Sequence, residues 1–116
     1  MKRAILRIGH LIFNVEIADS FLSRIKGLSF RKTLSRSEGL LFVFSKPGKY
    51  KFWMFGMKFP IDIAFISENK KVVDKITLEL GDEYTASKEF KYALEVKKGL
   101  LKDISIGDDV EWISMN

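Results

Sequence analysis

The sequence predicts a mainly β protein, a small single-domain β-sandwich or barrel of about seven or eight short strands with one or two short helices. Strand-like runs recur at roughly ten-residue spacing, and glycine or proline residues separate many of them. The chain has 116 residues, of which 47% are hydrophobic. That length supports one domain with a core that needs no disulfides, and it is too short for two ordinary domains. We therefore expect residues 1–116 to form a single domain.

The chain is expected to open as a β-hairpin. Apolar residues occupy every second position from Leu11 to Ile17, and Asn14 and Glu16 lie between them. This alternation is typical of a half-buried strand. Residues 3–8 resemble a second strand, and Gly9-His10 between the two suits a two-residue turn in which glycine supplies a positive φ. The single histidine is therefore expected to be exposed in a turn.

A short helix is predicted to follow the hairpin. Asp19 or Ser20 can cap its start, and Gly27 can end it after Lys26. Three apolar side chains share one face of this helix at helical spacing, namely Phe21, Leu22 and Ile25. The polar segment 28–38 is expected to be a loop.

The remaining elements are mostly strands. In residues 71–80 the alternation slips near Val73 and Asp74, which indicates a bulge or a strand break. Residues 100–104 are expected to form a short helical turn. The other predicted strands are 39–44, 50–55, 61–66, 92–96 and 109–113.

Composition excludes several kinds of chemistry. The chain has no cysteine, so it can form no disulfide, thiolate zinc site or iron–sulfur cluster. His10 is the single histidine, which excludes a metal site built on a histidine pair. No glycine-rich phosphate-binding motif is present. We therefore expect no metal and no cofactor.

Charge is distributed unevenly along the chain. The formal net charge is +5, with 12 basic and 3 acidic residues through Pro60, and 8 basic and 12 acidic residues after it. Clustered lysine and arginine can attract phosphates or acidic partners. A nucleic-acid-binding surface on the basic N-terminal half is therefore one hypothesis.

Targeting signals and membrane spans are not expected. The longest apolar runs, such as residues 40–44, fall far below the ~18 residues that a helical span needs. Arg7, and then the polar residues Asn14 and Glu16, interrupt any apolar segment of a signal peptide. We therefore expect a cytoplasmic protein. The lysine-rich, cysteine-free composition is similar to that of thermophile proteins.

Two carboxylates fall in strands that are otherwise largely apolar. By strand alternation, Asp62 and Glu95 each project from a face that they share with apolar neighbours. Burying an unpaired carboxylate is unfavourable, so each needs a partner or a pocket. Arg24 and Arg31 are suitable partners because guanidinium matches carboxylate geometry. Two interpretations stay open: a structural salt-bridge network, or a pocket that binds a polar ligand or performs acid–base chemistry.

An aromatic run at residues 52–55 supplies the other candidate site residues. If this run is a strand, Trp53 and Met54 point to opposite faces, and one face can line a groove. Exposed aromatic side chains beside lysines would suit stacking on nucleic acid bases. A strand buried on both faces is the competing interpretation.

The ordered set of these segments resembles the DUF192 family, a bacterial and archaeal group with no established activity. The resemblance extends over about residues 13–113. It implies a small mainly β domain, and it groups Arg24, Arg31, Trp53, Asp62 and Glu95 as one constellation. The matching stretches are residues 18–20 with Arg24, 27–28, Arg31, 39–44, 52–54, 60–66, 93–96, Gly99 and 107–108.

Three functional hypotheses follow from these residues. The preferred one is a binding module with a cleft near Trp53, Met54 and Asp62, which takes a small polar or anionic ligand or a protein partner. The second is a small enzyme that uses Asp62 or Glu95 as a general acid or base, which requires both carboxylates to share a cavity. The third is nucleic-acid binding by the basic half.

Overall fold

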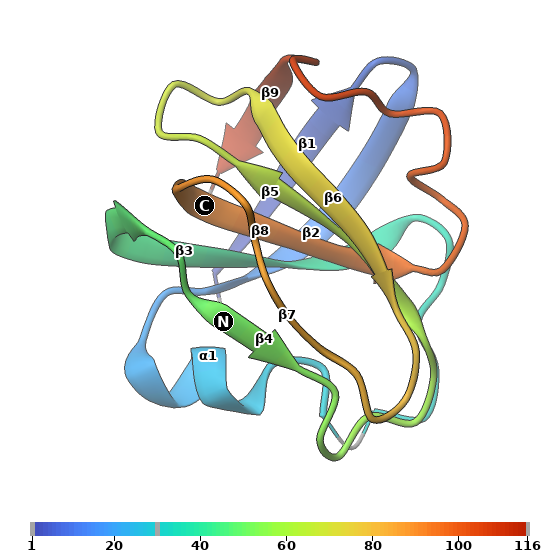
Figure 1. Ribbon diagram of the computed structural model, residues 1–116. Coiled ribbons are helices and arrows are strands. Elements are labelled where there is room, and N and C mark those ends of the chain that lie inside the picture. The colour runs from blue at the N-terminus through green and yellow to red at the C-terminus, as the bar shows by residue number, and fades with distance from the viewer. Residues whose placement is uncertain (1, 30, 116) are drawn as a thin grey trace.

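A seven-stranded sheet in the order β6-β5-β8-β3-β2-β1-β9 organises this protein (Figure 1). The computed structural model describes residues 2–29 and 31–115. Within these residues lie nine strands and one short helix, so the predicted mainly β fold is confirmed. Their bounds are β1 (Arg3–Ile8), β2 (Leu11–Ala18), α1 (Phe21–Lys26), β3 (Glu38–Gly48), β4 (Lys51–Trp53), β5 (Ile61–Ile66), β6 (Val72–Leu78), β7 (Glu83–Thr85), β8 (Phe90–Lys97) and β9 (Val110–Met115).

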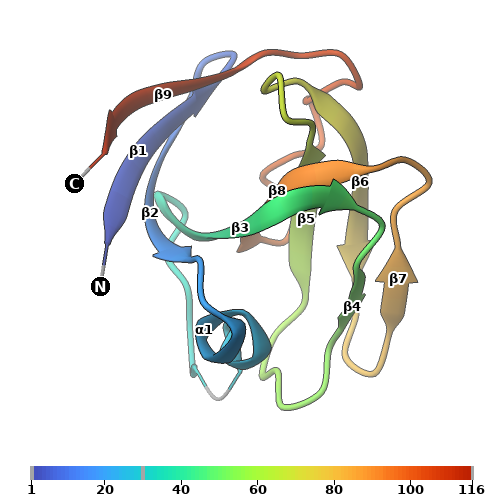
Figure 2. The ribbon, with the colours of Figure 1, turned by 90° about the vertical axis from the view of Figure 1, so that its left-hand side faces the viewer.

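The large sheet curls into a half-closed barrel (Figure 2). Its neighbouring strands are antiparallel, except that β2 and β3 are parallel. The edge strands β6 and β9 approach each other at one end, where the Val110 N–H donates to the Lys70 carbonyl at 2.9 Å and an antiparallel bridge joins Lys71 to Asp109. A second sheet pairs β4 with β7.

Two hydrophobic cores lie on opposite faces of the central strands. The first fills the inside of the curl and includes Leu94 and Val96 of β8. The second lies between the outer face and the β4–β7 sheet, and it includes Ala93 of β8 with Phe65 and Phe90. Aromatic rings dominate this second core, where the ring centroids of Phe65 and Phe90 are 4.8 Å apart. Most of the described phenylalanines are therefore core residues, because both faces of the central strands are covered.

The predicted hairpin and helix are confirmed. Ile8 pairs with Leu11 across the Gly9-His10 turn, and Gly9 has a φ of +60°. The Ser20 hydroxyl accepts the N–H of Ser23 at 3.1 Å, and the Ser23 hydroxyl accepts the N–H of Ser20 at 3.0 Å. This reciprocal pair is a capping box, which satisfies backbone donors at the helix start.

The helix ends at a glycine, as predicted, and lies close to the sheet there. Gly27 has a φ of +50°, and a Cβ at this position would lie 3.3 Å from Cζ of Phe42. The predicted apolar face does not enter a core, since none of the residues of α1 is buried. Phe21, Leu22 and Ile25 are exposed instead.

The strands after the helix differ from the prediction in detail. Strand β3 continues through Pro47-Gly48. Strand β7 was not predicted, because three residues are too few to show an alternation of apolar and polar side chains. The bulge is confirmed: Phe65 pairs with Asp74 and Ile66 with Val72, which leaves Val73 as the extra residue. The 100–104 segment consists of hydrogen-bonded turns.

We predict that Gly39→Ala destabilises the fold. A Cβ on Gly39 would lie 2.8 Å from the backbone oxygen of Glu95 on the paired strand, which cannot move without breaking the β3–β8 ladder. We expect a loss of roughly 1–3 kcal/mol in the free energy of unfolding, measured by urea denaturation. The exposed neighbour Ser37→Ala is the control and should change this value by less than about 0.5 kcal/mol. Equal stability of the two variants would contradict the prediction.

Candidate functional site

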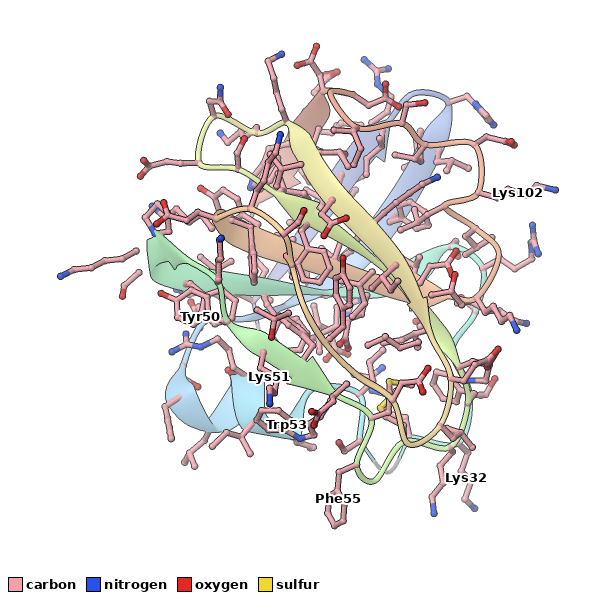
Figure 3. All side chains as sticks on the ribbon, viewed as in Figure 1. Lys32, Tyr50, Lys51, Trp53, Phe55 and Lys102 are labelled. Atoms are coloured by element: carbon pink, nitrogen blue, oxygen red, sulfur yellow. The ribbon has the colours of Figure 1, made fainter. Side chains whose placement is uncertain are left out.

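A pocket of about 430 Å³ opens between helix α1, strand β3 and strand β4. Aromatic side chains from the second core form much of its wall, and the exposed helix face contributes to its mouth. Figure 3 shows Tyr50, Lys51 and Trp53 in succession along and just before β4. The lining residues are Phe21, Arg24, Ile25, Lys26, Gly27, Leu28, Ser29, Phe42, Phe44, Tyr50, Lys51, Phe52, Trp53, Met57 and Glu95.

Glu95 places a carboxyl group in the wall of this apolar pocket. It lies in the middle of β8, directly between Leu40 of β3 and Ile63 of β5, and both neighbours are buried. Its exposed fraction is 5%, and its Oε1 atom has no hydrogen-bond partner among the described residues. Burial raises the pKa of Glu95 from its ordinary value of 4.5 to about 8. The carboxyl is therefore mostly protonated at neutral pH and can donate a hydrogen bond.

Arg24 joins the helix to the sheet at one side of the pocket. Its Nη1 donates to the backbone oxygen of Val43 at 3.0 Å, and its Cζ lies 5.1 Å from the centroid of the Phe44 ring. A cation over an aromatic face is attracted by the electron-rich ring. Arg24 therefore anchors the helix and also lines the pocket.

Trp53 lines the pocket with an exposed fraction of 49%, so it is available to a ligand. Met54 is buried in the second core and is not a lining residue. Two lysines, Lys26 and Lys51, add positive charge at the mouth. Lys51 also forms an exposed ion pair with Glu83, with a Nζ–Oε1 distance of 3.4 Å.

Asp62 lies on the other face of the sheet. It pairs with Val96 across β5 and β8, whereas Glu95 pairs with Ile63, so the two carboxyls point in opposite directions. Asp62 accepts hydrogen bonds from Thr77 Oγ1 at 2.6 Å and from the N–H groups of Gly99 and Leu101 at 2.9 and 3.1 Å. These contacts tie the turn after β8 to β5 and β6.

Asp62 borders a separate cavity of about 320 Å³, which Lys75, Lys98 and Lys102 also line. The carboxylates therefore do not share a cavity, as an enzyme using both would require. Lys75 donates from Nζ to the backbone oxygens of Leu101 and Lys102 at 3.0 and 3.2 Å. Like Asp62, Lys75 holds the turn in place.

Arg31 belongs to a third location. Its Nη2 donates to Oε2 of Glu16 at 2.7 Å, and Arg3 approaches the other oxygen of the same carboxylate at 3.4 Å. The six candidate residues thus separate: Arg24, Trp53 and Glu95 meet at the pocket, and Arg31, Met54 and Asp62 do not line it.

Sequence reasoning missed the aromatic wall of the pocket. The sequence predicts strands at Phe42, Phe44 and Phe52. A strand pattern does not indicate that a cavity remains beside these side chains. The one available signal was the fully apolar face of a short helix.

Residues 2–29 and 31–115 contain no group of three or more histidine, cysteine, aspartate or glutamate side chains placed to hold a metal ion. Nor does any helix in this part of the chain have the length and apolarity to cross a bilayer.

This fold also occurs in other proteins of known structure. The structure is similar to that of a protein of unknown function from Novosphingobium aromaticivorans. The TM-score is 0.87 and the sequence identity is 28%, and the match covers 95% of this chain and 85% of that one. A Sinorhizobium meliloti protein described as a proposed transcription regulator has a TM-score of 0.88 over 97% of this chain and 94% of that one. Its 22% identity shows the fold alone. The fold is thus that of a small, mainly β group of proteins.

The sequence then identifies the family. Residues 4–112 match the profile of DUF192, described as "Uncharacterized ACR", and the chain belongs to this family. It is 35% identical over 104 residues to a UPF0127 protein of Pyrococcus abyssi, covering 86% of each chain. It is 33% identical over 105 residues to a UPF0127 protein of Pyrococcus furiosus, covering 87% of this chain and 88% of that one. Both relatives come from thermophilic archaea, as the composition suggested.

We predict that Asp62→Asn destabilises the protein through the turn after β8. An asparagine has one accepting oxygen and no charge, so it can accept from Gly99 and Leu101 only as neutral hydrogen bonds, and its amide nitrogen cannot accept from Thr77. We expect a loss of about 3 kcal/mol in the free energy of unfolding, measured by urea denaturation. Asp103→Asn changes an exposed aspartate with the same chemistry and should be nearly neutral. A loss below about 1 kcal/mol for Asp62→Asn would refute the structural role.

We also predict that Glu95 makes stability depend on pH. The pKa of Glu95 is about 8 in the folded state and near its ordinary value of 4.5 in the unfolded chain. Between these values the folded state holds the extra proton, so rising pH favours unfolding. The contribution from one group approaches about 1.4 kcal/mol per pH unit.

Glu95→Gln should remove this contribution, since an amide does not titrate. Urea denaturation at about pH 5, 6.5 and 8 measures the slope. The exposed Glu89→Gln should retain the wild-type slope. If Glu95→Gln had the same slope as wild type between pH 5 and 8, Glu95 would not be protonated in the folded protein.

Proposed function

We propose that this protein is a binding module for a small, largely apolar molecule that enters the pocket between α1 and β4. The observation that carries the proposal is the Glu95 carboxyl, which is buried in the pocket wall with an oxygen that has no partner among the described residues. Buried polar groups in native proteins are nearly always hydrogen-bonded, so an unpaired one at a cavity suggests a ligand.

The size and lining of the pocket support the same proposal. Ligand pockets are commonly 300–1,000 Å³, mostly apolar, and have a few placed polar groups. Here aromatic rings supply the apolar wall, and Glu95 and Arg24 supply polar groups. The exposed side chains of Phe21 and Ile25 extend the apolar surface at the mouth. The ligand would therefore gain most of its binding free energy from burying an apolar body.

Binding is favoured over the enzymatic alternative by the position of the acids. Asp62 is fully engaged on the opposite face, so catalysis would depend on Glu95 alone. Ser29 also lines the pocket, but its hydroxyl donates to the backbone oxygen of Phe55 at 3.1 Å. Neither residue has a nucleophile–base partner among the described lining residues.

Nucleic-acid binding remains a second candidate because Trp53 and Phe55 are exposed near Lys51. Stacking on these rings would depend strongly on salt, since lysines would release counterions from phosphates. Titration of single-stranded DNA at low and moderate salt separates this candidate from small-molecule binding.

A cytoplasmic location is part of the proposal, and the absence of cysteine supports it.

A pocket-narrowing variant tests the proposed function with the neutral fluorescent probe N-phenyl-1-naphthylamine. Ile25 and Ile12 are matched, with exposed fractions of 50% and 55%, but only Ile25 lines the pocket. We expect saturable binding to wild type, weakened roughly tenfold in Ile25→Trp and unchanged in Ile12→Trp. Fluorescence titration gives the three dissociation constants. No saturable binding, or equal weakening in both variants, would exclude this pocket as the site.

A further inference from the structure

We propose that the ligand is an amphipathic carboxylate, whose apolar body fills the pocket and whose carboxylate accepts a hydrogen bond from Glu95. This inference rests on the proposed function and adds the chemical class of the ligand. It depends on the position of one carboxyl, the charges around it and the shape of the apolar wall.

Glu95 can offer a hydrogen-bond donor to a ligand. Its neighbours across the strands, Leu40 and Ile63, supply no hydrogen-bonding side chain, and both are buried. The raised pKa of Glu95 keeps a proton on the carboxyl at neutral pH. A protonated carboxyl has one O–H donor, and it forms its strongest hydrogen bond with a charged acceptor. The complement of Glu95 is therefore an anionic oxygen.

The other charged side chains that line the pocket are basic. Helix α1 contributes Arg24 and Lys26, and the β4 region contributes Lys51 and the phenol of Tyr50. Strand β3 contributes only aromatic rings, Phe42 and Phe44, to this lining. The described lining thus contains three cations and, apart from Glu95, no acid. Glu83 partly offsets the charge of Lys51, whereas Arg24 and Lys26 form no ion pair with a described residue, so the local potential favours an anion.

The same lining disfavours a cationic ligand. An organic cation would form its strongest contact with an ionised Glu95, and ionising this carboxyl in its apolar surroundings is unfavourable. It would also pass the two lysines and Arg24 at the wall. A carboxylate meets neither obstacle. Arg24 uses one N–H group for the Val43 carbonyl, so other N–H groups of its guanidinium can add to the attraction.

Three eight-carbon probes with the same apolar body test the ligand class: octanoate, 1-octanol and octylammonium. Each displaces N-phenyl-1-naphthylamine from the wild-type protein, and the competition curve gives its affinity. At about pH 7 we expect octanoate to bind roughly tenfold more tightly than octanol, and octylammonium to bind most weakly. Equal affinities, or preference for octylammonium, would overturn the inference and leave the proposed binding function intact. If neither the dye nor any of the three probes bound, the proposed function itself would fail.

The pH dependence supplies a second readout in the same assay. Octanoate affinity should fall about tenfold between pH 7 and 9, because only the protonated fraction of Glu95 can donate. Octanol affinity should change little, since a hydroxyl both donates and accepts. An octanoate affinity that rises or stays constant with pH would overturn the inference.

Two variants of Glu95 separate its hydrogen bond from its packing. Glu95→Gln keeps an N–H donor that does not titrate, so octanoate should bind at pH 7 within about threefold of wild type and show no loss at pH 9. Glu95→Leu removes the donor and should weaken octanoate roughly tenfold while dye binding persists. Loss of octanoate binding in Glu95→Gln alongside normal dye binding would contradict the assigned hydrogen bond.

Discussion

The whole structure depends on one constraint, namely that the central strands β5, β8 and β3 are apolar on both faces. A sheet of this kind must be covered on both sides, because exposing either apolar face to water would lower the stability of the fold. The curl of the large sheet closes over one face and forms the first core. The small β4–β7 sheet and the loop after the helix cover the other face, with Leu28 and Leu34 of that loop in the second core, whereas α1 contributes no buried residue. The pocket opens beside this layer, between α1, β3 and β4.

Asp62 and Glu95 are both buried in this sheet, but their carboxyl groups have different surroundings and different protonation states. Their exposed fractions are 4% and 5%, and they lie on neighbouring strands. On the face of Asp62, the turn after β8 presents N–H groups that satisfy the carboxylate. On the face of Glu95, the neighbours are aliphatic and aromatic side chains. One acid therefore serves as a clamp within the fold, and the other is held neutral with hydrogen-bonding capacity unused.

The sequence was sufficient for the fold class because local signals agreed with the final structure. The Gly9-His10 turn, the Ser20 cap and the slip at Val73 each have a backbone cause that can be recognised in a few residues. It was insufficient for the site. Strand alternation predicts the sheet face from which a side chain projects, but it does not predict which residues pack against that face. Glu95, which lies in the pocket wall, was among the predicted site residues, but its separation from Asp62 and Arg31 depends on how the two cores pack. Strand β7 carried no alternation long enough to detect.

The exposed helix face has a physical explanation in this arrangement. An apolar stripe on a helix normally marks the side that enters the core, yet Phe21, Leu22 and Ile25 of α1 are exposed. The capping box and the close approach of Gly27 to Phe42 fix the position of the helix at both ends, and Arg24 ties it to β3. The helix therefore cannot rotate to bury this stripe without breaking those contacts. Its apolar side chains remain at the mouth of the pocket, where an apolar ligand would cover Phe21 and Ile25 as it enters.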